Sequence, residues 1–94
     1  MTVPNLALAG LRIELEKELV ALGARHGVTA TRGPILWIAR ELTNLHVLPP
    51  GANSVLSDLF PLLNKAVHGA RVESESVEWA LTAGAQILSS LREK

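Results

Sequence analysis

The sequence predicts an all-α fold, a compact antiparallel four-helix bundle that forms a single domain over residues 1–94. Three observations lead to this prediction. Glycine and proline residues divide the chain into four segments, and each segment repeats its apolar residues at helical spacing. No segment shows the alternation of apolar and polar residues that is typical of a strand. With 94 residues, 48% of them hydrophobic, the chain is long enough for one core and too short for two.

The first helix is expected over about residues 5–25, with Asn5 as its N-cap. Leucines at helical spacing form a stripe that should face the core, and a second apolar stripe lies on a different face. The first stripe is Leu8, Leu11, Leu15, Leu19 and Leu22, and the second is Leu6, Ala9, Ile13, Val20 and Ala24. A helix with two apolar faces needs two partners, so this segment predicts an interface in addition to a core.

The second helix is expected to follow a linker at residues 29–33, to have Pro34 at its first helical position and to end near Leu45. Its buried stripe is Ile35, Ile38, Leu42 and Leu45. The segment Val47–Gly51 should end it, because consecutive prolines remove amide donors and disfavour helical geometry before them.

The third helix should begin at Asn53 or Ser54, which are good caps, and end near His68, with Gly69 as a left-handed stop. Pro61 is expected to kink it or to free the carbonyl of Ser57. Its apolar arc is Val55, Leu56, Leu59, Phe60, Leu62, Leu63, Ala66 and Val67, opposite Ser57, Pro61, Asn64 and His68.

The fourth helix should begin at residues 74–76 and run to the end of the chain. Its inward residues are expected to be Val77, Ala80, Leu81, Gly84, Ile87, Leu88 and Leu91. A glycine within such a stripe predicts the close approach of another helix, here at Gly84.

Composition excludes several functions. Nine basic and nine acidic residues give a net charge of zero, so no long-range field attracts nucleic acid or anionic lipid. The absence of cysteine excludes disulfides and thiolate zinc sites, and the three histidines lack the spacing of metal ligands. We expect no metal, no cofactor and no membrane insertion by this segment. The expected location is the cytoplasm, either free or tethered to a membrane by a segment outside this sequence.

Asn64 and His68 lie one helical turn apart and are the first candidates for chemistry. His68 could act as a general acid or base with Asn64 orienting it. The structural alternative, in which His68 interacts favourably with a helix C-terminus, is favoured. Arg12 and Glu16 form a second pair, four residues apart, which predicts a salt bridge at a helix margin. Arg12 is also the best available ligand for an anion, if it faces His68.

Trp37 and Trp79 both lie away from the apolar stripes of their helices. Exposed tryptophan is a favoured anchor at protein interfaces. The alternative is that a helix is rotated or that a tryptophan covers a loop. Together with Ile13 and Val20 on the second stripe of the first helix, the two tryptophans predict an interface, with a homodimer or another protein as partner.

Three stretches carry a resemblance to a known family. They are Leu-Ala-Leu-Ala-Gly-Leu-Arg-Ile-Glu-Leu-Glu at residues 6–16, Ile-Ala-Arg-Glu-Leu at residues 38–42 followed by Val-Leu-Pro-Pro, and Leu-Asn-Lys-Ala-Val-His-Gly at residues 63–69. Over about residues 5–91 the chain resembles HEPN-type (higher eukaryotes and prokaryotes nucleotide-binding) domains. It is most similar to a bacterial branch of unknown function, whose members often form the terminal domain of membrane or defence-associated proteins.

This resemblance implies a homodimer of antiparallel helical bundles. Active members are metal-independent ribonucleases that use an arginine followed by a polar residue and a histidine. Asn64 matches the polar position and His68 the histidine, but Leu63 stands where the arginine should precede Asn64. Without that cation the site is incomplete.

The favoured function is therefore a non-catalytic, HEPN-like domain that self-associates and mediates protein interaction. Arg12, Glu16, Asn64 and His68 would then form a structural polar cluster that fixes the end of the third helix. One alternative is a HEPN-type ribonuclease or nucleotide-binding, toxin-like domain that uses His68, with Asn64 and Arg12 in support. Another is an antitoxin-like or regulatory domain that buries its tryptophans on another protein.

Overall fold

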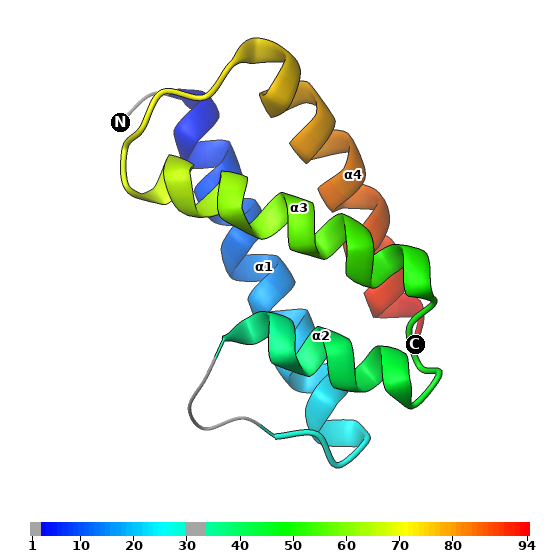
Figure 1. The fold of residues 1–94 in the computed structure, drawn as a ribbon. Helices are drawn as coiled ribbons and strands as arrows, with labels where there is room; N and C mark the ends of the chain where they lie inside the picture. Colours follow the sequence, from blue (N-terminus) through cyan, green and yellow to red (C-terminus); the bar gives the residue numbers. More distant parts are fainter. Residues whose placement is uncertain (1–2, 30–33) are drawn as a thin grey trace.

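The computed structural model describes residues 3–29 and 34–94, which form four α-helices and, within these ranges, no strand (Figure 1). The helices are α1 (Val3–Arg25), α2 (Ile35–Asn44), α3 (Pro50–Val67) and α4 (Ser74–Glu93). The prediction of an all-helical chain with four helices is confirmed. Residues 30–33 of the predicted linker lie outside the described ranges. The radius of gyration is 13.0 Å, close to the value of about 12 Å expected for a compact chain of this length.

The core forms around α1, which packs against each of the other three helices (Figure 1). Four residues of its predicted leucine stripe, Leu8, Leu15, Leu19 and Leu22, have no exposed surface, and the fifth, Leu11, is partly buried. Each of the other helices contributes buried side chains. They are Ile38 and Leu42 from α2, Leu56, Leu59, Phe60 and Leu63 from α3, and Ala80 and Leu91 from α4.

The helix directions differ from the predicted antiparallel bundle. α3 runs antiparallel to α1, but α4 runs in the same direction as α1. Leu11 packs at Gly84, and further along both helices Arg92 reaches Glu14 and Glu18. In Figure 1 the short α2 lies across the C-terminal half of α1 rather than alongside its whole length. It therefore does not act as one of four alternating antiparallel helices, and α4 returns to the side of α1 in the same direction as α1. The antiparallel prediction is therefore wrong for the pair of α1 and α4.

Gly84 permits the close approach that the sequence predicts. A Cβ atom at this position would collide with the side chain of Leu11 on α1. Gly23 has a second close contact, which the sequence analysis missed. A Cβ atom there would lie 2.6 Å from the backbone oxygen of Val28 and 2.9 Å from Cγ2 of Ile38. Two glycines thus let α1 pack closely against the rest of the chain.

Two helices begin earlier than predicted. α3 begins at Pro50, preceded by Pro49 in extended geometry (φ −70°, ψ 154°). Proline is favoured at the first helical position, since it lacks only an amide hydrogen that would have no partner there. α1 already begins at Val3, so Asn5 lies inside the helix and the prediction of an N-cap at this residue is wrong. Pro61 lies inside α3 as predicted.

Helices α2 and α3 end with the same backbone motif. After α3, Gly69 is left-handed (φ 80°), and the amide of Ala70 donates to the carbonyl of Lys65 at 2.9 Å. After α2, the left-handed position is occupied by His46 (φ 61°), and the amide of Val47 donates to Leu42 at 2.9 Å. Both are Schellman motifs, which usually place glycine at this position. The predicted stop at Gly69 is confirmed.

Three apolar residues that the sequence placed in buried stripes are exposed instead. They are Leu45, Val67 and Leu81. Leu45 follows the last residue of α2, and the turn through His46 directs the chain so that Leu48 is buried in its place. Val67 is the last residue of α3, and Leu81 lies beside the buried Ala80 at the margin of the covered face of α4.

Candidate functional site

The outer face of α1 carries a row of uncovered apolar side chains. Leu6 is 58% exposed, Ile13 is 61% exposed and Val20 is 49% exposed. These residues are seven apart, so they form one row along the helix, on the side away from the leucines of the core. We call this row the α1 outer face. Ile13 and Val20 also line a shallow groove of about 510 Å³, whose described lining comes from α1. Its lining is Arg12, Ile13, Glu16, Lys17, Val20 and Ala21.

Gly10 lies on the same side of α1 and has no contact that explains it. A Cβ atom at Gly10 would have no neighbour within 4 Å. Glycine inside a helix costs about 0.5–1 kcal/mol relative to alanine. Within a single chain this cost has no compensation from packing, in contrast to Gly23 and Gly84.

A polar cluster borders the α1 outer face on the side of α3. The Arg12 guanidinium forms an ion pair with Glu16 (Nη1 to Oε2, 3.1 Å), and its Nε donates a hydrogen bond to Oδ1 of Asn64 at 2.7 Å. The Arg12 and Glu16 side chains are 32% and 44% exposed. Ion pairs with such exposure contribute about 1 kcal/mol or less to stability. Arg12 thus connects α1 to α3, and both of its acceptors lie within this cluster.

His68 does not join this cluster. It caps the C-terminus of α3 and is exposed, as are Asn64 and the other residues predicted on that side of the helix. Among the described residues, no hydrogen bond or ion pair connects its side chain to Arg12, Glu16 or Asn64. The structure therefore brings together three of the four residues of the predicted cluster.

Asn5 holds the end of α3, a role that the sequence analysis did not assign. It is only 4% exposed, and its Nδ2 donates hydrogen bonds of 3.1 Å to the carbonyl oxygens of both Ala66 and Ala70. The last carbonyls of a helix have no partner within the helix. A side chain from α1 supplies one here. Pro4 is the signal in the sequence that Asn5 is not the N-cap, since proline is favoured in the first turn and so places the helix start before Asn5.

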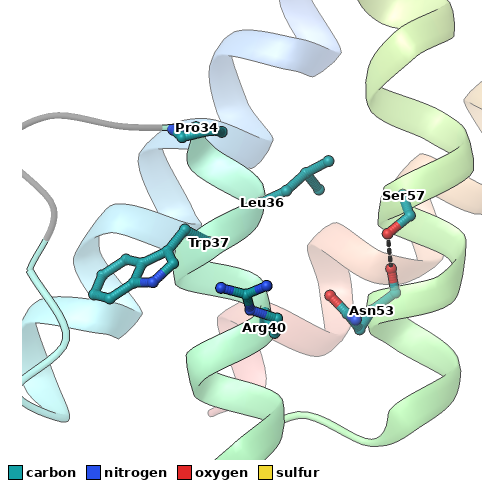
Figure 2. Close-up of a pocket in the computed structure, with 6 residues that line it drawn as sticks. All are labelled: Pro34, Leu36, Trp37, Arg40, Asn53 and Ser57. Carbon is teal, nitrogen blue, oxygen red and sulfur yellow. Dashed lines mark hydrogen bonds between the residues drawn. The ribbon is translucent and has the colours of Figure 1, made fainter.

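The two tryptophans lie on different surfaces. Trp37 is 37% exposed and lines a groove between α2 and α3 (Figure 2). Trp79 is 42% exposed. At 100° per residue it lies about 140° around α4 from Arg92, whose side chain reaches α1. Trp79 therefore points away from α1. The four residues predicted for an interface, Ile13, Val20, Trp37 and Trp79, do not form one continuous surface.

Two further searches concern the described residues only. They contain no group of three or more His, Asp or Glu side chains placed to hold a metal ion. No helix in the described ranges is long and apolar enough to cross a membrane.

No family model, no curated protein and no solved structure matches this chain. The resemblance to HEPN-type domains rests on the three sequence stretches alone and stays a prediction.

Proposed function

We propose that this chain is a non-catalytic, HEPN-like helical domain that forms a homodimer through the α1 outer face. The observation that carries this proposal is the uncovered row of Leu6, Ile13 and Val20. Three large apolar side chains, each about half exposed, follow one line on a central helix of the fold. Large exposed apolar side chains that align on one face of a helix are typical of an interface, whereas single exposed apolar residues need no explanation.

Gly10 supports the same proposal. A helix of a second copy that crosses α1 near Gly10 could approach closely, because no Cβ atom is in the way. The cost of a glycine inside the helix would then be offset by packing between the two chains. In the isolated chain nothing offsets it.

The engagement of Arg12 supports a domain without catalysis. A ribonuclease needs a cation that is free to hold a phosphate. The guanidinium of Arg12 is already bound by the carboxylate of Glu16 and the amide oxygen of Asn64.

The experiment is a measurement of solution mass by light scattering after size exclusion, over a range of concentrations. One chain has a mass of 10.1 kDa, and we expect twice this value. Ile13→Glu should reduce the mass to that of a monomer, because it places a charge in the centre of the row. Leu45→Glu is the matched control, because Leu45 is 53% exposed but lies outside the row, and it should leave the dimer intact. A monomeric parent chain would contradict the proposal, and a dimer that tolerates Ile13→Glu would contradict the assignment of the face.

One observation favours the ribonuclease as a second candidate. Arg12 donates from its Nε to Oδ1 of Asn64 at 2.7 Å, so it could stand in for the arginine that the resemblance lacks next to Asn64 in the sequence. Release of Arg12 from Glu16 would free a guanidinium beside Asn64, and Asn64 lies one helical turn from His68 on α3. RNA cleavage that His68→Ala abolishes, with an unchanged helical spectrum, would favour this candidate. Cleavage that is equal in His68→Ala and the parent chain would exclude His68 as the base.

A further inference from the structure

A second surface site lies between α2 and α3, away from the α1 outer face. It is a groove of about 470 Å³ lined by Pro34, Leu36, Trp37 and Arg40 on the α2 side and by Asn53 and Ser57 on α3. In Figure 2 the Arg40 side chain lies between Trp37 of its own helix and Asn53 of α3. The groove therefore combines apolar and aromatic surface with a few polar groups, which is typical of binding sites.

The groove carries one positive charge. Among the described residues that line the groove, Arg40 is the charged one. In the ranges that the structure describes, the ion pairs of arginine involve Arg12 and Arg92, and no carboxylate lies within 4 Å of the Arg40 guanidinium. A ligand with one carboxylate in contact with Arg40 would match this charge.

The hydrogen-bonding groups also favour an acceptor. Arginine presents five N–H donors and no acceptor. Facing it, Asn53 has an amide that donates through its nitrogen and accepts through its oxygen, and in Figure 2 the oxygen lies toward Arg40. The hydroxyl of Ser57 already donates its hydrogen to the backbone oxygen of Asn53, at 2.9 Å (Figure 2). The Arg40 guanidinium is thus the main donor that a ligand would meet, and a carboxylate can accept two hydrogen bonds from it.

We propose that this groove binds an acidic segment of a partner protein, with an Asp or Glu carboxylate on Arg40 and a neighbouring apolar side chain on the ring of Trp37. Tryptophan and arginine are the residue types that most often dominate binding energy at protein interfaces. A polyanion such as RNA would need several cations, and the described lining of the groove supplies one. Small-molecule sites bury most of their ligand, but this groove is open, because Trp37 and Arg40 are both exposed, and a peptide can lie along it.

The test uses two peptides of six residues with blocked ends, Gly-Leu-Glu-Leu-Glu-Gly and the counterpart in which both Glu residues are Gln. Each is titrated into the full chain, and the indole N–H signals are followed by NMR. The chain has two tryptophans, so Trp79 is an internal control. The Glu peptide should shift the signal of Trp37 and leave that of Trp79 unchanged. The Gln peptide should bind about tenfold more weakly, because it loses a charge-assisted hydrogen bond.

Two variants test the role of the charge. Arg40→Gln should weaken binding of the Glu peptide about tenfold. Arg71→Gln is the matched control, because Arg71 is exposed, lies outside the groove and should leave the affinity unchanged. Equal affinity for the Glu and Gln peptides, equal loss in both arginine variants, or no shift at millimolar peptide would overturn the proposal. It would also be overturned if inorganic phosphate or a uridine hexanucleotide shifted the Trp37 signal with a higher affinity than the Glu peptide.

Discussion

Removal of the Asn5 side chain amide should destabilise the protein through the far end of α3. In Asn5→Ala, the carbonyls of Ala66 and Ala70 both lose a donor at 3.1 Å. Ala66 is fully buried, so water cannot replace the Asn5 amide there, although the Ala66 oxygen still accepts a hydrogen bond from the amide of Gly69. Loss of the Asn5 hydrogen bond to Ala66 therefore costs about 1.5 kcal/mol. Ala70 is exposed and water replaces the donor, so its loss costs about 0.5 kcal/mol.

The better helix propensity of alanine returns about 0.5 kcal/mol, which leaves a net loss of about 1.5 kcal/mol. For a chain of this size, this corresponds to a decrease in Tm of about 6–12 °C. The assay is thermal unfolding followed by circular dichroism, at one fixed protein concentration because self-association would also shift Tm. Asn44→Ala is the matched control, because Asn44 is exposed and makes only one bond of 3.5 Å, and it should change stability by less than about 0.5 kcal/mol.

Asn5→Asp separates hydrogen bonding from packing. The two side chains have nearly the same size, but an ionised carboxylate cannot donate to a carbonyl. We expect Asn5→Asp to destabilise the protein at neutral pH at least as much as Asn5→Ala. If Asn5→Ala behaved like Asn44→Ala, or Asn5→Asp like the parent chain, the reasoning about the end of α3 would be refuted.

Two further predictions concern the backbone and use the same unfolding assay. His46→Gly should raise stability by about 1 kcal/mol, because His46 occupies a left-handed position (φ 61°) that glycine adopts without strain; a lower Tm would show that the His46 side chain stabilises the turn. Gly23→Ala should lower stability by about 1–3 kcal/mol, since a Cβ atom would lie 2.6 Å from the backbone oxygen of Val28, which cannot move without the turn. A Gly23→Ala variant as stable as the parent would mean that this turn adjusts freely.

The sequence predicts the helices and the side of each that faces the core, because apolar spacing reports burial directly. It therefore predicts the buried leucines of α1 and the exposed side of α3 that carries Asn64 and His68. The consecutive prolines Pro49 and Pro50 predict a loop, but proline also fits the first helical position, and Pro50 begins α3.

Contacts between distant segments could not be predicted from local spacing. Arg12 meets Asn64 across 52 positions of the chain, and Asn5 meets Ala66 across 61. Both contacts depend on the direction in which α3 crosses α1. The parallel course of α1 and α4 likewise depends on the crossing angle of α2, for which the sequence carries no local signal. By contrast, the salt bridge of Arg12 with Glu16 could be predicted from the sequence, since the two residues lie one helical turn apart on the same helix.

The parallel pairing of α1 with α4 has a consequence for how fast the chain folds. Leu11 and Gly84 are separated by most of the chain, so this contact closes a very long loop. Proteins with contacts between residues far apart in sequence fold more slowly than helical proteins with local contacts. During synthesis, at about 5–20 residues per second, α1 emerges several seconds before α4. Throughout that interval the side of α1 that carries Leu11 has no helix to cover it.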